Sequence, residues 1–190
     1  AFLITQIELL EIIIDGSASQ HRFIWHLVEG SFWGSIYTFT INFIEVLSIL
    51  AFFGTIIFLS RRNIIKLARF QKPEMKGWPS RDANLILCGE IILVTCIMLM
   101  NSSDVALQRQ GVFHHTGTFI ISTAIANFFT GIPKDTLLIM ERVGWWGHVS
   151  GILGFMVYLP FSKHFHIFLA FPNTYFSNLK PQGQFTNLAA

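Results

Sequence analysis

The chain has 190 residues, of which 52% are hydrophobic and 13% charged, and its formal net charge is +2. Soluble domains usually carry about 25% charged residues, so this composition argues against a water-soluble globular domain and favours a membrane protein. The small net charge gives no support for nucleic-acid binding, and the two cysteines share one apolar run, two helical turns apart, which predicts neither a disulfide nor a metal site.

The first apolar run, residues 1–15, is too short to cross a bilayer alone, because a spanning helix needs about 20 residues. The sequence begins without a methionine or a signal-peptide pattern. We therefore expect a fragment whose first helix starts upstream. Glu8, Glu11 and Asp15 share one helical face by their i, i+3 and i+4 spacing; Glu8 and Glu11 are candidate proton acceptors, or are simply solvated.

Three longer runs, at about 36–60, 82–101 and 145–168, have the length and apolar character of membrane-spanning helices. A weaker run at about 117–131 is short and polar, so we expect it to lie at the interface. Seven of the 13 basic residues fall between 61 and 81, which places that loop and the C-terminus in the cytoplasm by the positive-inside rule. The sequence thus predicts one all-α domain over 1–190, an integral membrane bundle of three full spans, part of an upstream span and an interfacial helix.

Two carboxylates, Glu45 and Glu90, lie about nine residues into their predicted helices. A charged carboxylate is costly at that depth unless it is protonated or paired. Both are candidates for moving protons, and the alternative is a neutral carboxyl group bonded to a neighbouring helix.

The last predicted helix carries two histidines in phase. His148 opens it and His166 closes it, and their spacing of 18 residues equals five turns, or about 27 Å. The two rings should therefore point the same way near opposite membrane surfaces, which suits two haems stacked across the bilayer. Alternatively, both are interfacial residues.

Three glycines, Gly147, Gly151 and Gly154, follow the first of these histidines. They would leave room for a flat macrocycle against the helix. Glycines at this spacing also form helix-packing surfaces in lipid, so both interpretations stay open.

The segment from Trp146 to Phe168, with its Leu-Pro-Phe-Ser-Lys-His-Phe-His-Ile-Phe ending, resembles the haem-bearing last helix of the nitrate reductase gamma-subunit family. The resemblance implies that His148 and His166 are axial ligands to b haems. More of the chain is similar to the membrane domain of heterodisulfide-reductase-related iron–sulfur proteins of Bacteroidota, in the segments 8–16, 61–63, 72–79, 82–85 and 171–175. In those proteins a cytoplasmic domain with iron–sulfur clusters follows. None of its cluster cysteines occurs here, so we expect the clusters in a partner or in a missing C-terminal domain.

The chain departs from the family pattern at the partner ligands, because it lacks the pair of histidines ten residues apart. The partner of His166 would then lie upstream of the sequence. Candidate second-haem ligands, all in predicted outer segments, are His21, His26, His114 and His115.

These features together predict a cytochrome b-type electron carrier in the bacterial inner membrane. It would bind one or two haems b, exchange electrons with quinone or quinol, and pass them to or from a cytoplasmic iron–sulfur protein or domain within a larger complex. The chain would then be the membrane subunit or domain of a quinone-linked oxidoreductase. The alternative is a non-redox membrane anchor or a proton-handling transporter subunit.

Overall fold

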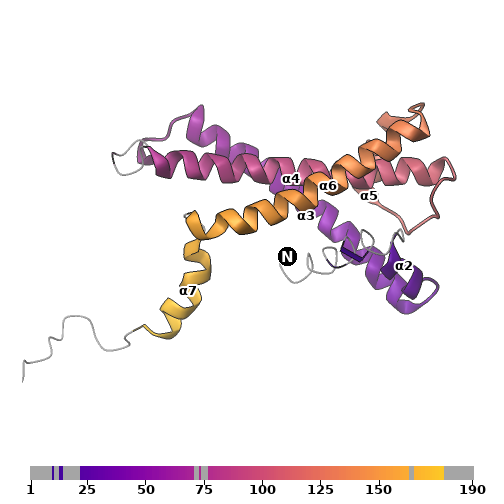
Figure 1. The fold of residues 1–190 in the computed structure, drawn as a ribbon, viewed down its shortest axis with the longest axis horizontal. Helices are drawn as coiled ribbons and strands as arrows, with labels where there is room; N and C mark the ends of the chain where they lie inside the picture. Colours follow the sequence, from indigo (N-terminus) through magenta and orange to yellow (C-terminus); the bar gives the residue numbers. More distant parts are fainter. Residues whose placement is uncertain are drawn as a thin grey trace, which may run out of the picture.

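The computed structural model describes residues 10, 13–14, 22–70, 73, 77–162 and 165–177. This part of the chain is helical and contains no strand (Figure 1). In chain order its elements are α2 (Phe23–Val28), α3 (Phe32–Asn63), η1 (Ala68–Phe70), α4 (Trp78–Arg109), α5 (Ile120–Ala126), η3 (Asn127–Phe129), α6 (Lys134–Tyr158), η4 (Leu159–Phe161) and α7 (Phe165–Tyr175). The prediction of an all-α fold is confirmed for these residues.

Two of the described helices, α3 and α4, are long and apolar enough to cross a membrane. Each has 32 residues, or about 48 Å, so each exceeds the hydrocarbon thickness of about 30 Å and extends beyond the ranges expected from sequence. The helix α6 contains no stretch of spanning length with as high a mean hydropathy as those in α3 and α4, and it is not a candidate span. Its N-terminal third contains four charged residues, at positions 134, 135, 141 and 142. Two candidate spans are therefore established by composition, and the third predicted span is not.

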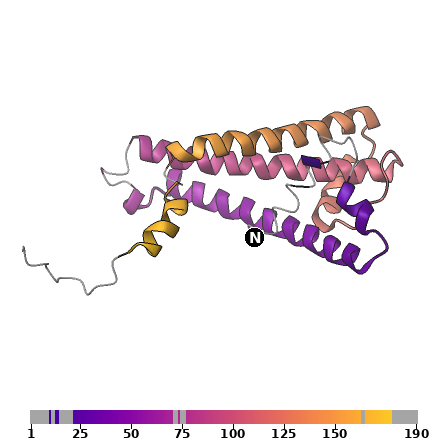
Figure 2. The same ribbon diagram turned by 60° about the horizontal axis from the view of Figure 1, so that its bottom comes forward.

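The helices α4 and α6 lie side by side and run antiparallel (Figures 1 and 2). The direction follows from contacts, since Gly144 faces Cys96 and Met100, whereas Tyr158 donates a hydrogen bond to Asp82 near the start of α4. A side chain at Gly144 would place its Cβ 2.8 Å from the Cys96 carbonyl oxygen and 2.8 Å from the Met100 nitrogen. The missing side chain is thus what allows the two backbones to approach, as is common for small residues between membrane helices.

Replacing Gly144 with alanine should destabilise the protein by about 1–3 kcal/mol, because the new methyl group meets backbone atoms that cannot move aside. The matched control is Gly154→Ala, where a Cβ would meet nothing within 4 Å. We expect the control to change stability by no more than about 1 kcal/mol. Thermal unfolding in detergent measures both, and equal midpoints for the two variants would contradict the close α4–α6 contact.

The short elements α2, α5 and η3 gather at the end of the bundle opposite the α3–α4 connection (Figure 2). Ile121 and Ile125 of α5 pack against a cluster formed by Ile97, Met98 and Met100 of α4. The helical run Ile120–Phe129 is only about 15 Å long. It coincides with the predicted short helix at 117–131 and cannot span a bilayer.

The predicted helix 145–168 is not one rod. The structure starts it earlier, at Lys134, and ends it at Tyr158. The turn η4 contains Pro160, which has no N–H to continue the ladder, and Ser162 is extended with φ −100° and ψ 162°. After this break α7 turns sharply away from the axis of α6 (Figure 1).

Candidate functional site

His148 lies in the middle of α6, fourteen residues after its start at Lys134 and ten before its end at Tyr158. The corresponding rises are about 21 Å and 15 Å. The expectation that His148 opens its helix is therefore wrong, because the helix gains eleven residues before the predicted start at 145. The imidazole therefore lies along the middle of α6, beside α4, and not at a helix end.

The ring of His148 is half-buried against α4, and its Nδ1 lies 3.0 Å from the carbonyl oxygen of Leu93. A carbonyl can only accept, so Nδ1 carries the proton and Nε2 is left with its lone pair. Metal-ligating histidines in proteins are usually oriented by such a bond from the second ring nitrogen. His148 thus meets the chemical requirement for an axial ligand to haem iron through Nε2.

The three candidate haem-packing glycines have different surroundings. A Cβ at Gly147 would lie 2.7 Å from the Cys96 sulfur, and one at Gly151 would lie 2.5 Å from a methyl group of Leu93, whereas Gly154 has open space. Packing against α4 therefore accounts for Gly147 and Gly151 without a macrocycle. The helix-packing interpretation is favoured for these two, and a haem-packing role stays a prediction for Gly154.

His166 lies in the first turn of α7, beyond the break, and its side chain is exposed. The phase argument required one continuous helix from His148 to His166, and that helix is absent. Ligation by His166 stays a prediction that rests on the resemblance.

Two of the four candidate second-haem ligands lie together. The rings of His26 on α2 and His114 in the loop after α4 have centroids 6.1 Å apart at 87°. Thr116, two residues from His114, is anchored to Gln108, which lies about 22 Å along α4 from Leu93. The pair therefore lies at a different level of α4 from His148, and ligation of haem by either histidine stays a prediction.

Among the remaining candidates, His115 is exposed, and His21, Glu8 and Glu11 lie outside the described residues. The described part of the chain holds no group of three or more His, Cys, Asp or Glu side chains placed to bind a metal ion. A site built on protein ligands alone is thus absent from these residues.

Glu45 is 1% exposed and holds the N-terminus of α5. Its Oε2 accepts from the Ile121 N–H at 2.9 Å, and its Oε1 accepts from the N–H and the hydroxyl of Ser122. One turn away, Asn42 accepts from the Ile120 N–H at 2.9 Å and donates to the carbonyl before the helix. A carboxylate at a helix N-terminus also complements the helix dipole, so the contacts give Glu45 a role in positioning α5. A role in moving protons stays a prediction.

Arg109 of α4 serves the opposite end of the same short helix. Its guanidinium donates to the Asn127 side chain at 2.9 Å and to the Thr123 carbonyl at 3.4 Å. A cation at a helix C-terminus is the favourable partner of the dipole. Two long helices thus clamp α5 by charges of opposite sign.

Changing Glu45 to glutamine should loosen α5, because an amide replaces one acceptor oxygen with a donor that faces backbone N–H groups. We expect a loss of about 1–3 kcal/mol and faster hydrogen exchange of the amides of 120–126. The control is Glu90→Gln, the same chemical change at an exposed position of α4. Unchanged exchange in both variants would contradict the clamp.

A buried polar network around the last third of α4 was not predicted from the sequence. The Arg22 guanidinium pairs with Asp104 at 3.4 Å, donates to the Asn101 side chain at 2.9 Å and covers the Phe119 ring. Gln108 joins Asp104 to Thr116, with distances of 3.1 and 2.9 Å. The sequence feature that could have indicated this network is the polar run Asn-Ser-Ser-Asp, which directly follows the apolar stretch of α4. The helix continues through this run to Arg109.

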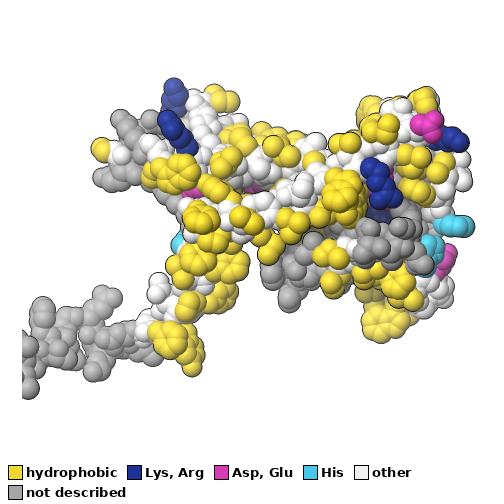
Figure 3. All heavy atoms as spheres, in the orientation of Figure 1, with side chains coloured by type: hydrophobic (Ala, Val, Ile, Leu, Met, Phe, Trp, Pro, Cys, Tyr) yellow, Lys and Arg dark blue, Asp and Glu magenta, His cyan; other side chains and the backbone are white. Residues whose placement is uncertain are grey.

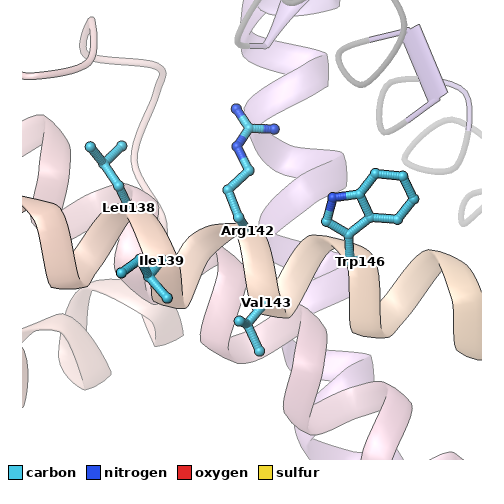
Figure 4. A pocket seen from close by; sticks show the side chains of 5 residues that line it. All are labelled: Leu138, Ile139, Arg142, Val143 and Trp146. Atoms are coloured by element: carbon cyan, nitrogen blue, oxygen red, sulfur yellow. The ribbon is translucent and has the colours of Figure 1, made fainter.

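Two surface hollows differ in their lining. One of about 350 Å³ lies along α6 and is apolar apart from Arg142 (Figure 4); it is lined by Leu138, Ile139, Arg142, Val143 and Trp146. It lacks the convergent polar groups of a cofactor site.

The other hollow, of about 700 Å³, lies between α2, α3 and α5 and combines aromatic walls with small hydroxyl residues. It is lined by Trp25, Gly30, Ser31, Gly34, Ser35, Thr38, Phe39, Asn42 and Ile120. Its size and mixed lining suit an aromatic ring with polar substituents.

Two curated proteins are similar to nearly the whole chain. One is a "Probable iron-sulfur-binding oxidoreductase FadF" of Bacillus subtilis (strain 168), 25% identical over 183 residues, covering 96% of this chain and 23% of the relative. The other is an "EtfAB:quinone oxidoreductase" of Syntrophomonas wolfei, 27% identical over 183 residues, covering 91% of this chain and 24% of the relative. The chain therefore spans about a quarter of the length of these relatives. No protein-family model and no solved structure matches it.

The chain is therefore similar to a probable iron–sulfur-binding oxidoreductase and to a quinone oxidoreductase. This relationship is consistent with the predicted electron-transfer role and with quinone and iron–sulfur partners. The finer resemblance to the nitrate reductase gamma subunit stays a prediction.

Proposed function

We propose that this chain is the haem b-binding membrane part of a quinone-linked iron–sulfur oxidoreductase. The observation that carries the proposal is the half-buried His148, whose Nδ1 is bonded to the Leu93 carbonyl so that Nε2 is available to iron. The similarity to an iron–sulfur and a quinone oxidoreductase supports a redox role for a chain with two candidate spans.

A haem b bound at His148 would supply one-electron chemistry, while the protein sets its position and surroundings. The α4–α6 contact holds the His148 ring, and the Leu93 carbonyl keeps one tautomer and strengthens the basicity of Nε2. The flanking apolar helices α3 and α4 exclude water from the bundle.

The groove between α2, α3 and α5 is the proposed site for the quinone ring. Trp25 and Phe39 offer aromatic surfaces, and Ser35 has an exposed hydroxyl group that can donate to a quinone oxygen. In this arrangement the basic loop between α3 and α4 faces the cytoplasm, as the positive-inside rule requires. The iron–sulfur clusters belong to a partner or to another part of the same protein, within a larger complex in the bacterial inner membrane.

The alternative, a proton-handling transporter subunit, relies on intramembrane carboxylates that are available to exchange protons. One of its two intramembrane carboxylates, Glu45, is occupied by the N–H groups of α5. The redox interpretation is therefore preferred.

The proposal is tested on the protein purified from bacterial membranes. We expect a b-type reduced-minus-oxidised spectrum, a pyridine haemochrome with one or two haems per chain, and reduction of the haem by a quinol analogue. If quinol analogues do not reduce the haem, the proposed reaction with quinone is wrong. If the purified protein contains neither haem nor iron, the proposed electron-carrier function is wrong.

A further inference from the structure

The helix α7 presents large apolar side chains that nothing in the described part of the chain covers. Phe168 is 58% exposed, Phe171 78% and Phe176, directly after the helix, 80%. Figure 3 shows that hydrophobic side chains cover much of the arm that leaves the bundle. Such a surface marks an interaction with a partner or a membrane.

The apolar character of α7 is concentrated on one side. Phe168, Phe171 and Tyr175 are three and four residues apart and share one face, whereas His166 and Asn173 lie on the opposite face. Among the four helices α3, α4, α6 and α7, this one is the most strongly one-sided. A spanning helix is apolar all round, and a one-sided helix rich in Phe and Leu is typical of the membrane–water interface.

The place of α7 agrees with that assignment. The bond from Tyr158 to Asp82 brings the end of α6 level with the start of α4, and Arg62 at the end of α3 reaches the carbonyl of Pro79. The junction with α7 therefore lies where both candidate spans end, beside the basic residues of the α3–α4 connection. From there α7 runs across the bundle axis in both views (Figures 1 and 2), which is the direction of the membrane plane if α3 and α4 cross it.

We propose that α7 is an interfacial helix that lies on the leaflet facing the α3–α4 connection, with its phenylalanines in the acyl-chain boundary. Anionic headgroups complement Arg61, Arg62, Lys66 and Arg81 at the same level. His166 stands in the first turn, next to the bundle, so a role for its imidazole in a cofactor site is compatible with this placement. The inference does not depend on haem binding and goes beyond the proposed function.

The test uses single cysteines at Phe171 and Asn173 in the full chain, on a Cys88→Ala and Cys96→Ala background. These positions are two residues apart and point in nearly opposite directions on a helix. Each variant is labelled with a bimane fluorophore and reconstituted in vesicles of phosphatidylcholine and phosphatidylglycerol, with and without brominated acyl chains.

We expect brominated lipid to quench the label at Phe171→Cys several-fold more than the label at Asn173→Cys, and aqueous iodide to quench them in the reverse order. Equal quenching of both labels by iodide would overturn the proposal, because α7 would then stand in water. Protection of the Phe171→Cys label from lipid and iodide alike would also overturn it, since a protein surface would then cover the helix. Circular dichroism confirms that both variants remain helical, so either outcome is informative.

Discussion

Replacing His148 with alanine is expected to remove the haem held by this residue and its b-type absorbance from the purified protein. Loss of a residue that merely orients a metal ligand already costs about 10–100-fold in affinity, so loss of the ligand should reduce haem occupancy at the His148 site by at least about tenfold. The bond from Nδ1 to the Leu93 carbonyl disappears as well. Haemochrome content per mole of protein is the measurement, with size-exclusion profiles to show that the variant is folded.

The control for this prediction is His164→Ala, which removes a histidine that is not among the candidate haem ligands. It should retain the full haem content. A wild-type spectrum in the His148 variant would show that another residue holds the iron, and the proposed site would then be wrong. Loss of haem in both variants would point to a general effect on folding.

Replacing Arg22 with methionine is expected to cost about 3–5 kcal/mol, the usual penalty for removing one partner of a buried ion pair. Arg22 is 4% exposed and Asp104 2% exposed, so the carboxylate would stay buried without its cation. Asn101 would lose a donor in the same step. The measurement is the free energy of unfolding in detergent.

Two further variants make this result specific. The double variant Arg22→Met with Asp104→Leu should recover much of the lost stability, because no charge remains buried. Lys134→Met at the exposed start of α6 should change stability by less than about 1 kcal/mol. If Arg22→Met behaves like the Lys134 variant, the network does not hold α2 to α4.

The network around Asp104 shows why the end of α4 could not be predicted from the sequence. The run Asn-Ser-Ser-Asp reads as a helix end entering water, and the predicted helix accordingly stopped at 101. The structure continues α4 to Arg109, because Arg22 reaches Asp104 over 82 residues of chain and satisfies it in the interior. Pairing at such a separation leaves no periodic signal in the sequence.

The same limit applies to the two carboxylates. Depth along the helix suggested one role for Glu45 and Glu90, since both lie at similar positions in apolar runs. The structure separates them, because α5 folds back onto Glu45 and leaves Glu90 exposed. Which side of a helix a neighbour covers is decided by packing and not by the local pattern.

The sequence by itself determined the helical class, the two long apolar helices and the short helix near 120–129, because hydrophobic length and composition are local properties. It also singled out His148. The ring of this residue of α6 is bonded through Nδ1 to the Leu93 carbonyl of α4, which is compatible with the proposed binding of haem iron through Nε2. Only the tertiary structure decided that this histidine lies mid-helix, that Pro160 and Ser162 divide the predicted last helix, and that Glu45 holds α5. These features depend on contacts between distant segments, where the burial of polar groups requires partners that the chain supplies only once it is folded.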